Sequence, residues 1–485
     1  KIAQYILHIV TYLVYMVPFL FLILPKSLSF FTKAFLTGEK MYSTWQPPVW
    51  PMKLCLFIGL LLLAIQGISE ILKKSTVGAK GGAGMSIQVA LLLALFGLMI
   101  IGLILGQELA FVLGGSGIIV GMLAWGDAGA TISMTKMYDQ MQSYSMVAIP
   151  MFVLMANFLT HSKMADGLFE SIRYLLGPLK GGLGLAVILV STVFAATTGI
   201  VGASVVTMGL LSMPILLRNG YNKALACGMV CAGGSLGILI PPSIMLVSMG
   251  SYAEVSVGKL FFAAIVPGLT LSLGYIIYIM VVCHVHPDYG PAMSAEELAQ
   301  MPFKKRVTGS LVNLIPPLIL IVAVLGSIFG GIATPTEAAG MGALFALILT
   351  IFYRQFSWKM LLDSLIDTAK TSAMVFIILF GAAAFTGIFM SMDGDILIAN
   401  WVTSLGIGKW GVFAIMMAIV FILGCFIDWL GIVMIVFPIF LPLMDMFGFD
   451  RLWLCAVTAV MLQTCFMTPP FGFALFYIKG IVPSN

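Results

Sequence analysis

The chain has 485 residues, of which 61% are hydrophobic and only 9% are charged. A soluble domain carries about 25% charged residues, so this composition excludes a soluble protein and indicates a chain surrounded largely by lipid. The net charge of +5 does not indicate a nucleic acid partner, because the basic residues cluster beside apolar runs, at 73–80 and 304–306. By the positive-inside rule we expect both of these loops to face the cytoplasm.

Apolar runs long enough to cross about 30 Å of hydrocarbon recur along the whole chain. We expect membrane-spanning segments at 5–25, 52–71, 87–106, 109–125, 145–160, 182–198, 225–250, 258–285, 310–330, 338–353, 372–392, 410–427 and 452–478. The sequence therefore predicts an all-α polytopic membrane protein. The seven cysteines show no C-x-x-C spacing, and His284 and His286 have no third partner nearby, so no transition-metal site is expected.

Three parts can be distinguished along the chain. Residues 1–75 hold two apolar runs around a polar, aromatic stretch, and residues 76–86, TVGAKGGAGMS, form a Gly-rich linker. The remaining block, 87–485, is dense in glycine. The polar interval 286–306 splits this block into halves at about 87–285 and 307–485.

The two halves show signs of an internal duplication. At a constant offset of 228 residues and without a gap, Gly220 pairs with Gly448 and Cys227 pairs with Cys455. The same offset superimposes two double prolines, one in each half. The matches fall on glycine and proline, the residues that dictate the path of the backbone, and so favour a repeat.

The double prolines interrupt apolar runs that would otherwise be continuous. LGILIPPSIML, 236–246, contains Pro241 and Pro242, and CFMTPPFGFAL, 465–475, contains Pro469 and Pro470. Each proline removes the N–H that would bond the carbonyl four residues earlier. Such carbonyls cannot face lipid, so they line a cavity or bind an ion. The alternative is a pair of proline kinks stabilised by neighbouring helices, but two breaks in register favour a binding role.

Oxygen-bearing residues precede the first break. AATTGIVGASVVTMG, 195–209, places Thr198 and Ser204 among small residues, and Gly199 permits a tight turn at the tip of a re-entrant hairpin. The same composition also suits close helix packing through small residues, so both interpretations stay open.

In the second half the corresponding stretch, GCFIDWLG at 424–431, places Asp428 inside an apolar run. A carboxylate at the bilayer centre costs about 2.5–3.5 kcal/mol, so it requires an ion or another partner. The alternative is a carboxylate near the interface, paired with a lysine or a helix end.

A third oxygen-rich patch is GIATPTEAAGMGA, 331–343. Thr334 or Thr336 could cap the helix that follows, with Glu337 in its first turn, where the helix dipole favours negative charge. We favour this capping role over direct contact of Thr336 and Glu337 with an ion.

These motifs resemble a known family. GIVGASVVTMGLLSMP followed by LGILIPPS, GIATPTEAA, and GCFID followed by TPPFGF resemble the large membrane subunit of tripartite ATP-independent periplasmic (TRAP) transporters. The front stretch TGEKMYSTWQPPVWPMKLCLFIGLLLLAIQG resembles the last two helices of the small subunit. The resemblance covers nearly the whole chain and identifies it as a fusion of the small and large subunits.

The resemblance implies an elevator-type secondary transporter of the bacterial inner membrane, with inverted repeats, re-entrant hairpins and broken helices. It implies Na⁺ as coupling ion, a small organic anion as substrate and a periplasmic substrate-binding protein as partner. Residues 1–75 would belong to the scaffold. Carried over by motif, the Na⁺ sites point to Gly199, Ser204, Gly237, Ser243, Asp428 and Thr468.

The chain departs from the family pattern in its small-subunit part, where two helices appear in place of four, and at its end, where a further span is expected. We therefore expect missing segments. Two other classes of protein remain. A stand-alone Na⁺/dicarboxylate-type elevator transporter would need no binding protein. A membrane enzyme would need paired histidines for haem, a quinone site or a catalytic dyad, none of which the sequence shows, so we do not expect an enzyme.

Overall fold

The structure is a computed structural model that describes residues 28–29, 32–33, 36–37, 83–104, 107–162, 164–404, 406–469 and 472–482. The chain forms two compact units, residues 1–94 with 100–106 and residues 95–99 with 107–485. In the first unit the structure describes most of helix α4 (Ala83–Ile104). This helix begins inside the expected linker, 76–86. The spans expected at 5–25 and 52–71 lie outside the described residues.

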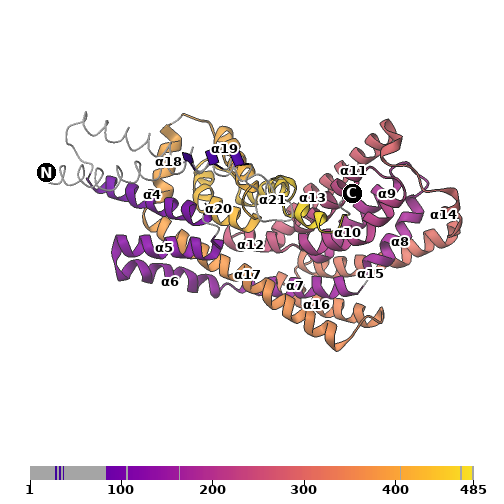
Figure 1. The fold of residues 1–485 in the computed structure, drawn as a ribbon. Coiled ribbons are helices and arrows are strands. Elements are labelled where there is room, and N and C mark those ends of the chain that lie inside the picture. Colours follow the sequence, from indigo (N-terminus) through magenta and orange to yellow (C-terminus); the bar gives the residue numbers. More distant parts are fainter. Residues whose placement is uncertain are drawn as a thin grey trace. The chain divides into compact units, whose positions relative to one another are not determined.

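The first half of the second unit, as far as it is described, consists of helices joined by short turns (Figure 1). Its α-helices are α5 (Leu109–Trp125), α6 (Asp127–Met141), α7 (Ala148–His161), α8 (Met164–Leu176), α9 (Gly182–Thr198), α10 (Val201–Arg218), α11 (Lys223–Ser235), α12 (Ile244–Tyr252) and α13 (Val257–Val285). Three short 3-10 turns are η2 (Tyr144–Val147), η3 (Leu236–Ile238) and η4 (Pro287–Tyr289).

The described residues of the second half also form helices joined by short connections. After the short α14 (Ala295–Ala299), its helices are α15 (Phe303–Phe329), α16 (Pro335–Phe352), α17 (Trp358–Ser391), α18 (Gly394–Ser404), α19 (Lys409–Gly424), α20 (Trp429–Met446), α21 (Arg451–Met467) and α22 (Phe473–Lys479). Seven helices among the described residues are long and apolar enough to cross a membrane. The chain is therefore an all-α multi-pass membrane protein, as the composition predicts.

Two helices of each half begin at the same offset as the sequence repeat. α10 and α20 each have 18 residues and begin 228 residues apart, at Val201 and Trp429. α11 and α21 also begin at that offset, at Lys223 and Arg451. The sequence analysis missed both α10 and α20 as spans, and each contains internal proline. Proline is tolerated in membrane helices where neighbouring groups satisfy the freed carbonyls.

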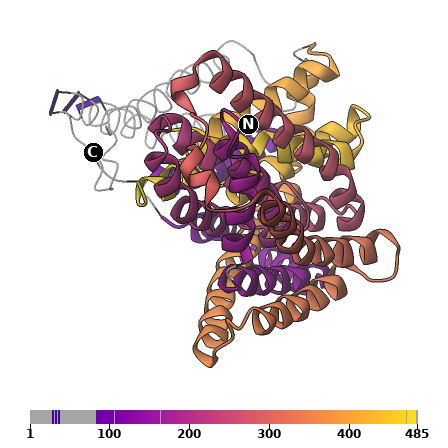
Figure 2. The same cartoon turned by 90° about the vertical axis from the view of Figure 1, so that its right-hand side faces the viewer.

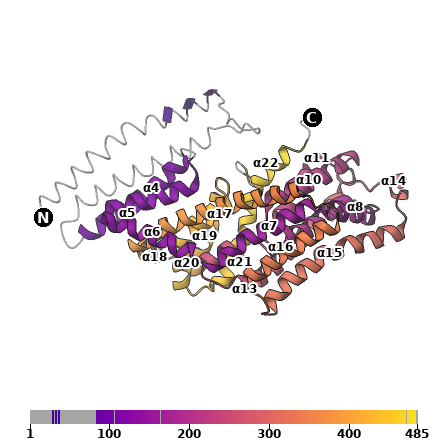
Figure 3. The same cartoon turned by 90° about the horizontal axis from the view of Figure 1, so that it is seen from below.

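Segments of the two interrupted helices pack against each other. α11, the first segment of one, packs against α22, the last segment of the other, and α12 packs against α21. Figure 3 shows α22 beside α10 and α11. α11 also packs against α21, so the two breaks lie in one region of the fold, as the broken helices of repeat-built transporters do. The expected segments 225–250 and 452–478 are thus not single helices but pairs, α11 with α12 and α21 with α22.

A second group of helices packs around the long α17, which runs beside α5, α6 and α7 (Figures 1 and 2). Small residues allow the closest of these contacts. A Cβ placed at Gly117 would lie 3.0 Å from the backbone of Ala384, and one placed at Gly381 would lie 2.3 Å from the carbonyl oxygen of Ala110. Small residues at helix interfaces let backbones approach closely, which drives helix association in lipid.

Candidate functional site: two hairpin tips and two helix breaks

The first candidate region is the turn between α9 and α10. Gly199 ends α9 in the left-handed conformation, with φ of 62°, and its N–H donates to the Ala195 carbonyl at 3.1 Å. A Cβ at this position would lie only 2.9 Å from the carbonyl oxygen of Pro242. The chain therefore reverses at a buried helical hairpin tip whose glycine touches the first double proline.

The first double proline separates η3 from α12. Ser243 is the N-cap of α12, and its hydroxyl accepts the Leu246 N–H at 3.3 Å and donates to the Ile238 carbonyl. That carbonyl is one of the two that Pro241 and Pro242, joined by a cis peptide bond, leave without their helical donor. The other belongs to Gly237, and among the described residues nothing donates to it.

Two hydroxyls of the hairpin face this break. The Thr198 and Ser204 hydroxyl oxygens lie 2.8 Å apart, and both residues are fully buried. Each hydroxyl also lies within hydrogen-bonding distance of a backbone carbonyl of its own hairpin, at 3.1 and 2.9 Å. A Cβ placed at Gly237 would lie 3.3 Å from the Ser204 hydroxyl oxygen. The structure thus brings together five residues that the sequence singled out: Thr198, Gly199, Ser204, Gly237 and Ser243.

The second hairpin, α19 with α20, places a carboxylate at its tip. Asp428 occupies the N-cap position of α20 and is half-buried. No described lysine or arginine forms an ion pair with it. Its place at a helix N-terminus, where the dipole favours negative charge, matches one of the alternatives weighed for this residue. The tip packs on α21, since a Cβ on Gly424 would lie 2.4 Å from the Cys465 sulfur.

The second break follows α21. Thr468 adopts an extended conformation after the last helical residue, and its hydroxyl donates to the Thr464 carbonyl at 2.7 Å. Pro469 forms an exposed turn, and Pro470 lies outside the described residues. The chain becomes helical again at Phe473, after Gly472 with φ of 42°.

Helix α22 connects the second break with the first hairpin. A Cβ on Gly202 would lie 3.0 Å from the hydroxyl oxygen of Tyr477. The Cys231 thiol donates to the Ala474 carbonyl at 3.4 Å. The sequence analysis missed Tyr477 and also Gln463, whose buried side-chain amide has no described hydrogen-bond partner. The sequence could have singled out Gln463, because it is a polar amide within an apolar run.

The third patch serves helix capping. Thr334, not Thr336, is the N-cap of α16. Its hydroxyl accepts the Glu337 N–H at 3.3 Å, and the Glu337 carboxylate accepts the Thr334 N–H at 2.8 Å. This is a complete capping box, which satisfies two helix N-terminal donors.

All-helical membrane proteins with two interrupted helices in inverted repeats form a recognised class of secondary transporters. The family model for the tripartite ATP-independent periplasmic transporter, DctM component, matches residues 92–485. The chain belongs to this family, and it is a multi-pass protein of the bacterial inner membrane.

Individual relatives agree with this assignment. The C4-dicarboxylate TRAP transporter large permease protein DctM of Pseudomonas aeruginosa is 33% identical over 71% of this chain and 79% of its own length. The isethionate TRAP transporter permease protein DctMQ of Oleidesulfovibrio alaskensis is 31% identical over 80% of this chain and 60% of its own length. In fold, the chain resembles the YdaH transporter of Alcanivorax borkumensis, with a TM-score of 0.53 at 15% identity, covering 83% of this chain and 92% of that one.

Proposed function

We propose that this protein is a Na⁺-coupled secondary transporter that imports a small organic acid anion delivered by a periplasmic substrate-binding protein. The observation that carries the proposal is the first hairpin tip, where buried hydroxyl oxygens meet a helix break. Ser204 faces Gly237 there, and Gly199 touches Pro242. Membership of a family of periplasmic transporters supports the need for a binding protein.

The ligand chemistry of this tip suits a hard cation. Carbonyl and hydroxyl oxygens are the groups that interrupted membrane helices offer to Na⁺. The Gly237 carbonyl has no described donor, and the Thr198 and Ser204 hydroxyls lie 2.8 Å apart. Each hydroxyl retains a lone pair for a cation while donating its proton. We assign one Na⁺ to this group, with Ser243 as a further oxygen.

A second Na⁺ would bind at the second tip and break. Asp428 supplies a carboxylate at the N-cap of α20, outside the ion pairs found among the described residues, and Thr468 supplies a hydroxyl at the end of α21. A carboxylate within a membrane-spanning region is costly without a counter-ion. Na⁺ bound beside Asp428 would remove that cost and prepare the two tips to accept an anion. Ion and anion then raise each other's affinity by the same factor.

The relatives narrow the class of substrate. They are named for transport of C4-dicarboxylates and of isethionate, which is a sulfonate. The shared chemistry is a small molecule with one or two oxyanion groups. We propose a substrate of this kind, moved by an elevator motion of the part of the chain that holds the two breaks.

Residues 1–75, which lie almost entirely outside the described residues, would act as a fused small subunit. This part of the proposal rests on the resemblance of the front stretch, TGEKMYSTWQPPVW, to the small subunit of the family. As part of the scaffold, it would stay fixed while the broken helices move.

The test is substrate uptake into proteoliposomes with the cognate binding protein under Na⁺ or K⁺ gradients, for the parent and for Asp428→Asn. We expect uptake that needs both Na⁺ and the binding protein and that falls sharply in the variant. Uptake without the binding protein would place the chain in the stand-alone elevator class. Uptake that is equal in K⁺ would refute Na⁺ coupling.

A further inference from the structure

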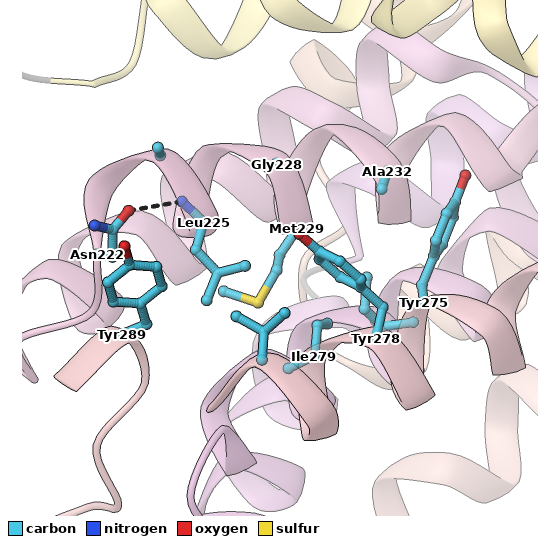
Figure 4. A pocket seen from close by; sticks show the side chains of 12 residues that line it. Asn222, Leu225, Gly228, Met229, Ala232, Tyr275, Tyr278, Ile279 and Tyr289 are labelled. Atoms are coloured by element: carbon cyan, nitrogen blue, oxygen red, sulfur yellow. Dashed lines mark hydrogen bonds between the residues drawn. The ribbon is translucent and has the colours of Figure 1, made fainter. Parts of the chain in front are cut away.

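A groove lies between α9, α11 and α13, and none of the residues that line it belongs to the two hairpin tips. It has a volume of about 690 Å³, within the range of small-molecule pockets. Figure 4 shows α11 on one side, with Leu225 and Met229, and α13 on the other, with Tyr275, Tyr278 and Ile279. Most of the lining is apolar, and Asn222 and Tyr289 form one polar end, while the Tyr275 and Tyr278 hydroxyls lie farther along the groove.

This groove opens toward lipid. Tyr278 is 60% exposed and Val281, on the next turn of α13, is 55% exposed. A Cβ placed at Gly228, on the α11 side, would meet nothing within 4 Å. α13 is also one of the helices long and apolar enough to cross the membrane. Apolar side chains exposed on such a helix face acyl chains rather than water.

Two exposed lysines are chain neighbours of the residues at the polar end of the groove. The Asn222 N–H donates to the Tyr289 carbonyl at 2.9 Å, and the Gly181 N–H donates to the Gly290 carbonyl at 2.8 Å. These two bonds hold residues 289–290 beside Asn222 and Gly181, whose chain neighbours Lys223 and Lys180 are both exposed. His286 stacks on Tyr289 with ring centroids 5.1 Å apart. Asp288, in η4, is the acidic residue in this turn.

The side of the membrane follows from charge. Tyr289, at the polar end, belongs to the loop 286–306, which ends in Lys304, Lys305 and Arg306. By the positive-inside rule this loop faces the cytoplasm. The cytoplasmic leaflet carries anionic lipids that attract basic residues near the membrane surface. The groove thus combines an apolar lining with two exposed lysines on the segments beside its polar end.

We propose that this groove is a binding site for an anionic phospholipid of the inner leaflet. One acyl chain lies between α11 and α13, and the headgroup phosphate accepts hydrogen bonds at the polar end from Lys180, Lys223 and the Asn222 amide. α11 leads directly to the break at Gly237. A lipid bound against α11 therefore stabilises the position of the helix that precedes the first candidate ion site. This inference does not depend on which anion or ion the protein transports.

The test is native mass spectrometry of the detergent-purified protein titrated with phosphatidylglycerol or with phosphatidylcholine of the same acyl chains. We expect one phosphatidylglycerol to bind more tightly than phosphatidylcholine. Each basic residue near a membrane surface changes affinity about fivefold, so Lys180→Gln with Lys223→Gln lowers phosphatidylglycerol affinity about 25-fold. The same double variant leaves phosphatidylcholine binding unchanged.

A second variant tests the apolar lining itself. Gly228→Leu fills open space with a good helix former, and Gly340→Leu is the matched control, because a Cβ there also meets nothing within 4 Å. We expect Gly228→Leu to lose the tight lipid and Gly340→Leu to keep it. Equal binding of the two lipids by the parent, or lipid retention in Gly228→Leu equal to that in the control, would overturn the proposal.

Discussion

The contact between the first hairpin tip and the first double proline can be tested with one methyl group. Gly199 has φ of 62°, where a non-glycine residue costs about 1–2 kcal/mol. Its new Cβ would lie 2.9 Å from the Pro242 carbonyl oxygen, a backbone atom that cannot rotate away. Overpacking of this kind costs about 1–3 kcal/mol. Gly199→Ala should therefore lower the free energy of unfolding by about 2–5 kcal/mol.

Gly448 supplies the control. It has φ of 71°, and a Cβ there would meet nothing within 4 Å. Gly448→Ala should cost only the conformational term, about 1–2 kcal/mol. The difference between the two variants, about 1–3 kcal/mol, isolates the contact of the hairpin tip with the break.

The assay is denaturant unfolding in detergent with and without Na⁺. A bound ion adds RT ln(1 + [L]/Kd) to the stability of the folded state. We expect Na⁺ to stabilise the parent and Gly448→Ala but to lose this effect in Gly199→Ala. Equal destabilisation of the two variants would refute the tip contact, and full Na⁺ stabilisation of Gly199→Ala would refute its role in ion binding.

Three further outcomes are expected. Ser243→Ala removes the cap of α12, and it should lower the free energy of unfolding by about 1 kcal/mol and weaken Na⁺ binding. The control Ser256→Ala removes the cap of α13; it should lower the free energy of unfolding by a similar amount but leave Na⁺ binding intact. Melting curves with and without Na⁺ would show the difference. Thr334→Ala removes the capping box of α16 and should lower the free energy of unfolding by about 1 kcal/mol in the same melting experiments. If the stabilisation by Na⁺ also changed in this variant, a purely structural role of Thr334 would be contradicted. Gly202→Ala displaces the Tyr477 ring and should reduce uptake rate although alanine favours the helix by about 1 kcal/mol; an unchanged rate would mean that α22 and the first hairpin need no fixed contact.

Much of the architecture is visible in the sequence because it depends on local patterns. The helices expected at 109–125 and 182–198 have the bounds of α5 and α9. The breaks fall where double proline removes backbone donors, and the offset of 228 residues reappears in the starts of α10 and α20. Length, hydropathy and proline position act within a few residues, so one sequence suffices to locate them.

The rest depends on contacts between distant residues. Gly199 meets Pro242, and Gly202 meets Tyr477, but no local pattern specifies either approach. The choice of Thr334 over Thr336 as the cap depends on backbone geometry, since the N-cap residue alone is extended. α10 was not among the expected spans, and its internal Pro214 is tolerated where neighbouring groups satisfy the carbonyl that it frees.

The most direct measurement is equilibrium binding of radioactive Na⁺ to the purified protein, compared for the parent, Ser204→Ala and Ser212→Ala. Both serines are fully buried on α10, but Ser204 faces Gly237 at the break and Ser212 donates to the Met208 carbonyl within its own helix. We predict saturable Na⁺ binding that is weakened in Ser204→Ala and unchanged in Ser212→Ala. Absence of saturable binding in the parent, or equal affinity in all three proteins, would contradict the assignment of a Na⁺ site to the first hairpin tip.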